Sequence, residues 1–119
     1  MTPLYDKITQ ALKRHADQEA ADIKLFVALI GELEPQHRDP KYRVDSNSRH
    51  NSATVTMIAG AAVCDVEVEN GKINILTPDR SSAVTVGTID EATTEVADRI
   101  AVALRMQKRR LHTMQAAYG

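Results

Sequence analysis

The chain has 119 residues, of which 43% are hydrophobic and 26% are charged, with 15 Lys and Arg against 16 Asp and Glu. This length is typical of one domain, residues 1–119, and is sufficient for a single hydrophobic core. The net charge of −1 excludes a broadly cationic nucleic-acid-binding protein and an acidic disordered chain.

The N-terminal sequence has no basic leader followed by an apolar segment, which argues against a signal peptide. The longest mostly apolar stretch, residues 23–33, contains Lys24 and Glu32 and is too short for a membrane span. The only cysteine, Cys64, cannot form an internal disulfide, and we expect it to be a buried structural residue. We therefore expect a cytoplasmic protein with no membrane partner.

Residues 1–34 are predicted to be helical. Apolar residues recur there at spacings of three and four, from Leu4 through Ile8 and Leu12 to Ile30. Thr2 is suited to the N-cap, Pro3 to the first helical position, and Pro35 follows the predicted end. The pattern leaves open whether this is one helix or two helices divided near residues 15–17.

Residues 35–52 are predicted to form a polar loop, because Val44 is their only strongly apolar residue. A loop of this length is usually functional or disordered.

Residues 53–87 carry the signals of an antiparallel sheet. Asn70-Gly71 is typical of a two-residue hairpin turn, and it would pair Glu69 with Lys72 and Val68 with Ile73, placing the apolar residues on one face. With one strand before this hairpin and another over residues 83–86, the sequence predicts a four-stranded meander.

Residues 88–117 are predicted to form the last helix. Thr88 and Glu91 are spaced as in a capping box, acidic residues come early, and basic residues come late, as the helix dipole favours. The expected fold class is therefore α+β: a long N-terminal helix, a four-stranded antiparallel meander and a C-terminal helix in two layers.

The N-terminal helix should extend past its sheet. About 30 helical residues span about 45 Å, whereas strands of about six residues reach about 20 Å. An apolar stripe beyond the sheet needs another cover, and we expect a homo-oligomer formed through this helix.

The common catalytic and metal-binding motifs are absent. The five glycines are scattered, and the sequence contains no GxSxG, HExxH or CxxC. His37 and His50 match no metal-ligand spacing, and Asp65, Glu67 and Glu69 should face solvent from one strand. We therefore expect neither an enzyme nor a cofactor.

The basic residues are the most suggestive functional feature. Arg105, Lys108 and Arg109 lie at helical spacing away from the apolar stripe of the last helix. Arginine is suited to phosphate, and Tyr42 could stack on a base. The further candidates in the long loop and in the turn after the third strand are Arg38, Lys41, Arg43, Arg49 and Arg80. The alternative is that these cations only complement the helix dipole and the solvent.

In size, in element order and in the one-turn spacing of Arg105 and Arg109, the chain resembles the phage-encoded anti-Thoeris sponges. These small oligomeric proteins sequester signals of the cyclic ADP-ribose type without cleaving them. The resemblance implies a cyclic nucleotide ligand and, for a phage protein, the host cytoplasm. The turn at residues 78–82 has no aromatic residue that could stack on an adenine.

The sequence thus leads to two hypotheses. The first is a non-catalytic, oligomeric binding protein for a phosphate-bearing small molecule, with Arg105, Arg109, Arg80, Lys108, Tyr42 and Arg43 as candidate ligand-binding residues. The second is a protein-interaction module, either chaperone-like or an inhibitor of a macromolecular partner. Nucleic acid is a less favoured partner, because acidic strands offset the basic segment.

Overall fold

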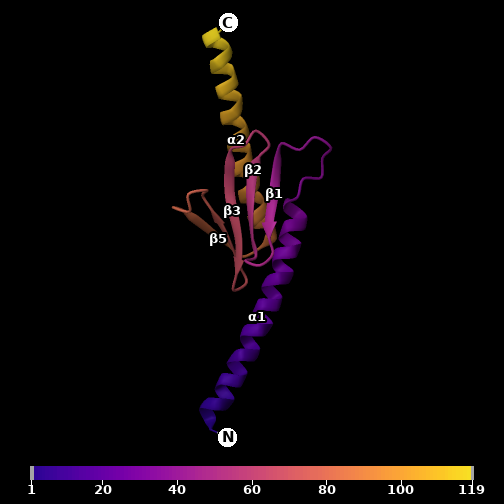
Figure 1. The fold of residues 1–119 in the computed structure, drawn as a ribbon, viewed down its shortest axis with the longest axis vertical. Helices are drawn as coiled ribbons and strands as arrows, with labels where there is room; N and C mark the ends of the chain where they lie inside the picture. Colours follow the sequence, from indigo (N-terminus) through magenta and orange to yellow (C-terminus); the bar gives the residue numbers. More distant parts are fainter. Residues whose placement is uncertain (1, 119) are drawn as a thin grey trace.

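A computed structural model describes the backbone of residues 2–118 and the side chains of residues 2–113. Two long helices pack on the same face of one antiparallel sheet (Figure 1). The elements are α1 (Pro3–Leu33), β1 (Tyr42–Asn47), β2 (Ser52–Met57), β3 (Ala62–Glu69), β4 (Lys72–Leu76), β5 (Ala83–Val86) and α2 (Ile89–Tyr118). The fold is α+β, as predicted.

Helix α1 is one uninterrupted helix of 31 residues, which answers the question left open by its sequence. It begins as predicted: the Thr2 hydroxyl accepts a hydrogen bond from the Tyr5 backbone N–H at 3.3 Å, and Pro3 is the first helical residue. Its buried residues, Asp22, Phe26, Leu29 and Leu33, all lie among its last 12 residues.

The sheet is a meander in the order β1-β2-β3-β4-β5, with every neighbouring pair antiparallel. The predicted hairpin register is confirmed, since Glu69 pairs with Lys72 and Val68 with Ile73. Asn70 and Gly71 have φ of 51° and 73°, the left-handed conformation that a two-residue turn of this kind requires.

The prediction of a continuous loop over residues 35–52 is wrong, because β1 lies within it and gives the sheet a fifth strand. As an edge strand, β1 pairs only with β2, and only Tyr42 and Val44 turn toward the core. Two apolar residues among polar ones are a weak alternating signal, which is why the sequence pattern missed this strand. The next strand, β2, also begins one residue earlier than predicted, at Ser52.

Helix α2 begins at the predicted capping residues. The Thr88 hydroxyl accepts a hydrogen bond from the Glu91 backbone N–H at 3.1 Å and donates one to the Glu91 carboxylate at 3.0 Å. Ala92 and Val96 are buried, and Ile100, Ala103 and Leu104 are partly buried against the same core. From Arg105 to Thr113 every described side chain of this helix is exposed.

The core lies between the helices and the apolar face of the sheet. Val55, Cys64, Val66, Ile73 and Ile75 from the three central strands are completely buried there. Leu29 of α1 and Ala92 of α2 are also completely buried, so both helices contribute to one core.

Asp22 joins α1 to the β3–β4 hairpin and is 7% exposed. Its carboxylate accepts hydrogen bonds from the backbone N–H groups of Asn70 at 2.9 Å and Gly71 at 2.8 Å, and from the Gln18 side chain at 2.9 Å. A buried carboxylate needs such donors, and here they fix the position of the hairpin turn along α1. Sequence reasoning did not single out this residue.

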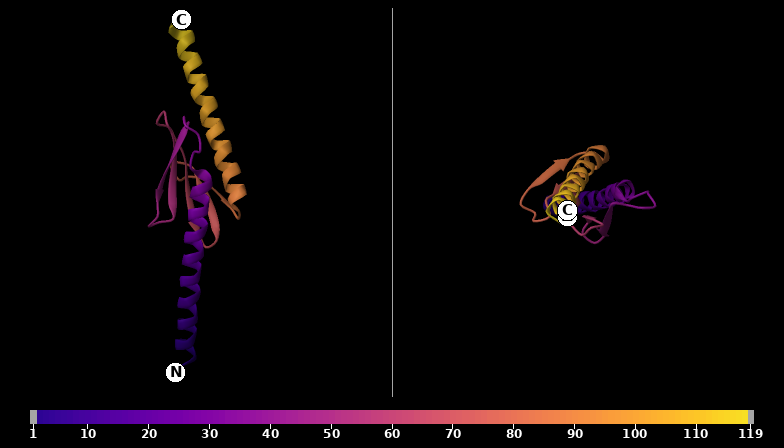
Figure 2. Two further views of the ribbon diagram at one scale, coloured as in Figure 1. Left: turned by 90° about the vertical axis from the view of Figure 1, so that its right-hand side faces the viewer. Right: turned by 90° about the horizontal axis from the view of Figure 1, so that it is seen from above.

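Both helices extend far beyond the sheet, in opposite directions (Figures 1 and 2). The molecule measures 81 × 31 × 22 Å, and its radius of gyration is 19.2 Å, against about 13.5 Å for a compact domain of this length. The predicted extension of α1 beyond the sheet is confirmed. An equivalent extension of α2 was not predicted.

Candidate anion-binding site

The part of α2 that lies beyond the sheet is strongly basic. Four Lys and Arg residues and one His fall within eight positions, and the sequence contains no Asp or Glu after Asp98. Among the side chains that the structure describes, none of these four cations forms an ion pair, whereas Arg99, six residues before the first of them, pairs with Glu95 at 3.0 Å. The positive residues are Arg105, Lys108, Arg109, Arg110 and His112.

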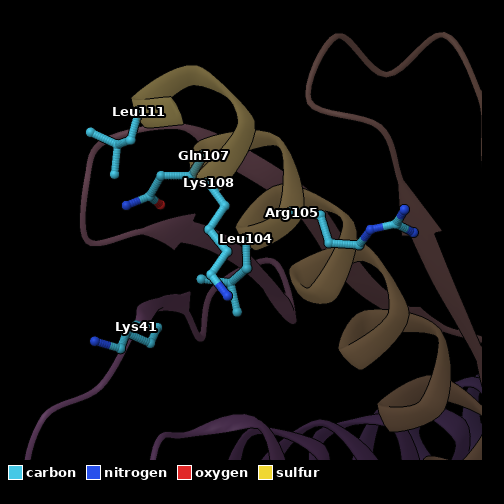
Figure 3. A pocket seen from close by; sticks show the side chains of 6 residues that line it. All are labelled: Lys41, Leu104, Arg105, Gln107, Lys108 and Leu111. Carbon is cyan, nitrogen blue, oxygen red and sulfur yellow. The ribbon is translucent and has the colours of Figure 1, made fainter. Parts of the chain in front are cut away.

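A groove of about 350 Å³ separates this segment of α2 from the chain that leads into β1. In Figure 3 the Lys108 ammonium extends toward Leu104 on the side of α2 that faces Lys41, whereas the Arg105 guanidinium points to the other side of the helix. Leu104 and Leu111 supply apolar walls, and Gln107 supplies an amide. The groove therefore combines two ammonium groups with apolar surface, a combination that suits an anion with an attached ring. Of the two ammonium groups, that of Lys41 also lies 3.8 Å from the exposed Asp39 carboxylate.

A second open hollow, on another side of the same helix, is lined by Lys108, Arg109, His112 and Thr113. Lys108 borders both hollows, so a ligand at either one would contact it. Of the predicted residues, Arg105 and Lys108 both line the groove, and Lys108 and Arg109 both line the second hollow.

Arg80 lies elsewhere, over the outer face of the sheet. It forms ion pairs with Glu67 and with Asp65, the latter at 3.5 Å, and the hydrogen bond and charge of Glu67 raise the pKa of its guanidinium. In the turn that presents it, the side chain and backbone N–H of Ser81 and the Thr77 hydroxyl donate to Asp79 and lower the pKa of Asp79 to about 2. The structure does not bring Arg80 to the basic end of α2.

Tyr42 and Arg43, at the start of β1, are also not among the residues that line the groove. Tyr42 is partly buried, and its hydroxyl donates a hydrogen bond of 2.7 Å to the backbone carbonyl of Leu33, where α1 ends. Burial raises the pKa of this hydroxyl. Arg43 is exposed and pairs with Asp45 at 3.3 Å. Tyr42 therefore connects α1 to β1, a position that does not leave its ring free to stack on a base.

The residue of this segment that lines the groove is Lys41, and not Tyr42 or Arg43. The sequence marks it only as one of several cations in a polar segment. Its position opposite α2 depends on the pairing of β1 with β2, where the Lys41 carbonyl accepts a hydrogen bond from the Ile58 backbone N–H at 3.0 Å. A prediction of β1 would have been the only route to this residue from the sequence.

Cys64 is completely buried, as predicted, and is a free thiol. Burial raises its pKa from 9.0 to about 11, and the nearby carboxylates add to the effect while Arg99 opposes it. A thiol with this pKa is almost wholly protonated at neutral pH and is a poor nucleophile.

Comparisons of the chain with protein-family models, with curated proteins and with solved structures gave no match. Within the described residues, neither helix is long and apolar enough to cross a membrane. The same part of the chain contains no group of three or more His, Cys, Asp or Glu residues placed to hold a metal ion.

Proposed function

We propose that the protein is a non-catalytic, oligomeric binding protein that sequesters a phosphate-bearing small molecule at the basic end of α2. The observation that carries the proposal is the set of four exposed, closely spaced cations, Arg105, Lys108, Arg109 and Arg110, which have no carboxylate partner among the described side chains. Four cations without counter-ions repel one another, and a bound phosphate would relieve that repulsion.

Dipole complementarity explains only part of this pattern. The favourable effect of a cation on a helix dipole falls off within the last turn. Arg105 and Lys108 lie more than two turns before Tyr118, where α2 ends. Their charge is therefore better explained by a ligand than by the helix end.

A cyclic nucleotide or a cyclic ADP-ribose isomer fits the groove between Lys41 and Lys108 by its chemistry, with phosphate near the ammonium groups and a ring against Leu104 and Leu111. This proposal follows the resemblance to the sponge proteins, and in a phage it would serve to remove an immune signal from the host cytoplasm. We therefore place Lys41 at the ligand beside the predicted Lys108, in place of Tyr42, Arg43 and Arg80.

A thermal-shift panel of cyclic nucleotides and cyclic ADP-ribose isomers tests this function. We expect a ligand to raise the melting temperature, with a smaller effect at high salt, and to be recovered intact after denaturation. The variant Lys108→Glu should weaken binding at least about tenfold, because a charge-assisted hydrogen bond contributes about 1.5–3 kcal/mol. Lys13→Glu, an equal charge change on α1, should leave binding unaltered.

The exposed apolar residues of α2 favour the second candidate, a protein-interaction module. Met106 and Leu111, on the same segment as the cations, and Val102, just before it, are each about half exposed. An acidic protein segment with apolar anchors would match this surface. Recovery of one stoichiometric protein partner, together with no response to the nucleotide panel, would decide for this alternative.

A further inference from the structure

The first half of α1 forms an amphipathic surface that nothing in the chain covers. Leu4, Tyr5, Ile8 and Leu12 are between 48% and 67% exposed, although they lie on one side of the helix. The opposite side carries exposed polar residues at the spacing of a second stripe: Asp6, Gln10, Lys13 and Asp17. A solvated helix does not need this division into two faces, so it indicates a packing partner.

The uncovered stripe is the continuation of the face that α1 buries against its own sheet. Ile8 lies on the same seven-residue row as Asp22 and Leu29, and Leu12 lies on the same row as Phe26 and Leu33. The partner of the free segment must therefore approach from the side on which the sheet lies, directly beyond the sheet's end.

The position of the β3–β4 hairpin turn determines how much of α1 extends beyond the sheet. Asp22 holds the turn at Asn70 and Gly71, and Gly71 lies next to the Gln18 side chain. Residues 3–17 extend past this point, and no strand lies beside the N-terminal half of α1 in Figure 1 or in the left view of Figure 2. At 1.5 Å per residue this segment is about 22 Å long.

We propose that the free segment pairs antiparallel with the same segment of a second copy, about a two-fold axis level with residue 10. Residue 10 is the midpoint of residues 3–17, and in this register the first turn of each helix meets the hairpin turn of the other chain. The two free segments then cover each other along their whole length.

The sequence is self-complementary in this register. Ile8 lies level with the partner's Leu12, and Leu12 with the partner's Ile8, so four branched side chains form the centre. Leu4 lies level with the partner's Ala16, where a small residue leaves room for the larger one, and Tyr5 lies level with the partner's His15. Any two-fold interface has such reciprocal pairs, and here they bring apolar residues together at its centre.

This pairing of α1 does not involve the ligand site on α2. The two-fold axis near residue 10 places the α2 helices of the two copies at opposite ends of the dimer, so each copy keeps its own basic segment. Loss of dimerization therefore tests the α1 surface, whereas loss of nucleotide binding tests the proposed function.

Light scattering and sedimentation of the full chain at micromolar concentration give the first test. We expect twice the mass of the 13.1 kDa chain, and a dissociation constant raised more than about a hundredfold in the double variant Ile8→Glu/Leu12→Glu, because the pairing would bury its new charges. The matched control Asp6→Lys/Lys13→Glu alters charge on the opposite face and should remain dimeric. A monomeric wild type, or a dimer that survives Ile8→Glu/Leu12→Glu with normal helix content, overturns the proposal.

Disulfide trapping between introduced cysteines tests the register. The native Cys64 is buried and does not interfere with this test. Ala11→Cys should form a covalent dimer under mild oxidation, because the two copies of residue 11 are about 3 Å apart along the axis. Gln10→Cys, on the opposite face, should not. Leu4→Cys should also remain monomeric on a denaturing gel, because its two copies are about 18 Å apart. Efficient trapping through Leu4→Cys would indicate a parallel pair and overturn the antiparallel register.

Discussion

The two free helix ends are similar in geometry and opposite in chemistry. Each belongs to a helix of about 30 residues that uses only part of its length to cover the sheet (Figure 1). The free end of α1 separates apolar from mixed-charge polar residues, whereas the free end of α2 concentrates positive charge. The same excess of helix length therefore exposes two chemically different surfaces, one apolar and one basic.

The packed half and the free half of α1 give the largest expected contrast in stability. Leu29→Ala should reduce the free energy of unfolding by about 2–5 kcal/mol, since Leu29 is completely buried and its truncation leaves a cavity. Leu12→Ala is the matched change at an exposed position of the same helix, and in dilute protein it should cost less than about 0.5 kcal/mol. Urea denaturation measures both values. Equal losses would contradict the separation of α1 into packed and free halves.

The boundary between these halves depends on Asp22. Asp22→Asn should cost about 2 kcal/mol, because the amide replaces a charged acceptor that holds two backbone N–H groups of the hairpin turn. Hydrogen exchange at Asn70 and Gly71 should increase in the same variant. The control Asp17→Asn changes an exposed carboxylate one helical turn and a half earlier and should alter neither quantity.

The stability of the packed region should also depend on pH through Cys64. The folded protein keeps the Cys64 thiol protonated up to a pKa of about 11, while the unfolded chain ionises near 9.0, so stability from this group is complete below pH 9 and is lost as the pH rises toward 11. At pH 10 the loss relative to pH 8 is about 1.4 kcal/mol. The difference between wild type and Cys64→Ala, followed by urea denaturation across this range, isolates the effect. A difference that does not change with pH would show that the thiol is not held protonated.

Local sequence signals predicted the elements that carry strong turn or capping chemistry. The hairpin at Asn70-Gly71 followed from residues that tolerate positive φ and from strands whose apolar faces agree with its register. Thr2 with Pro3 and Thr88 with Glu91 marked the starts of both helices. Strand β1 was missed because an edge strand of six residues with two inward side chains has almost no periodic signal.

The candidate site was predicted only where its residues share one helix. Arg105, Lys108 and Arg109 could be grouped from helical spacing alone. Lys41 could not be added to them, nor could Arg80, Tyr42 and Arg43 be removed, because their positions depend on how β1 pairs and on ion pairs across the sheet.

The sequence by itself determined the α+β class, the hairpin register, the burial of Cys64 and the excess length of α1, since each rests on contacts within one element or across one turn. Only the tertiary structure decided which part of each helix is left uncovered. That division depends on where Asp22 fixes the hairpin turn along α1 and where α2 leaves the sheet after Leu104, and both are set by contacts between residues far apart in the chain.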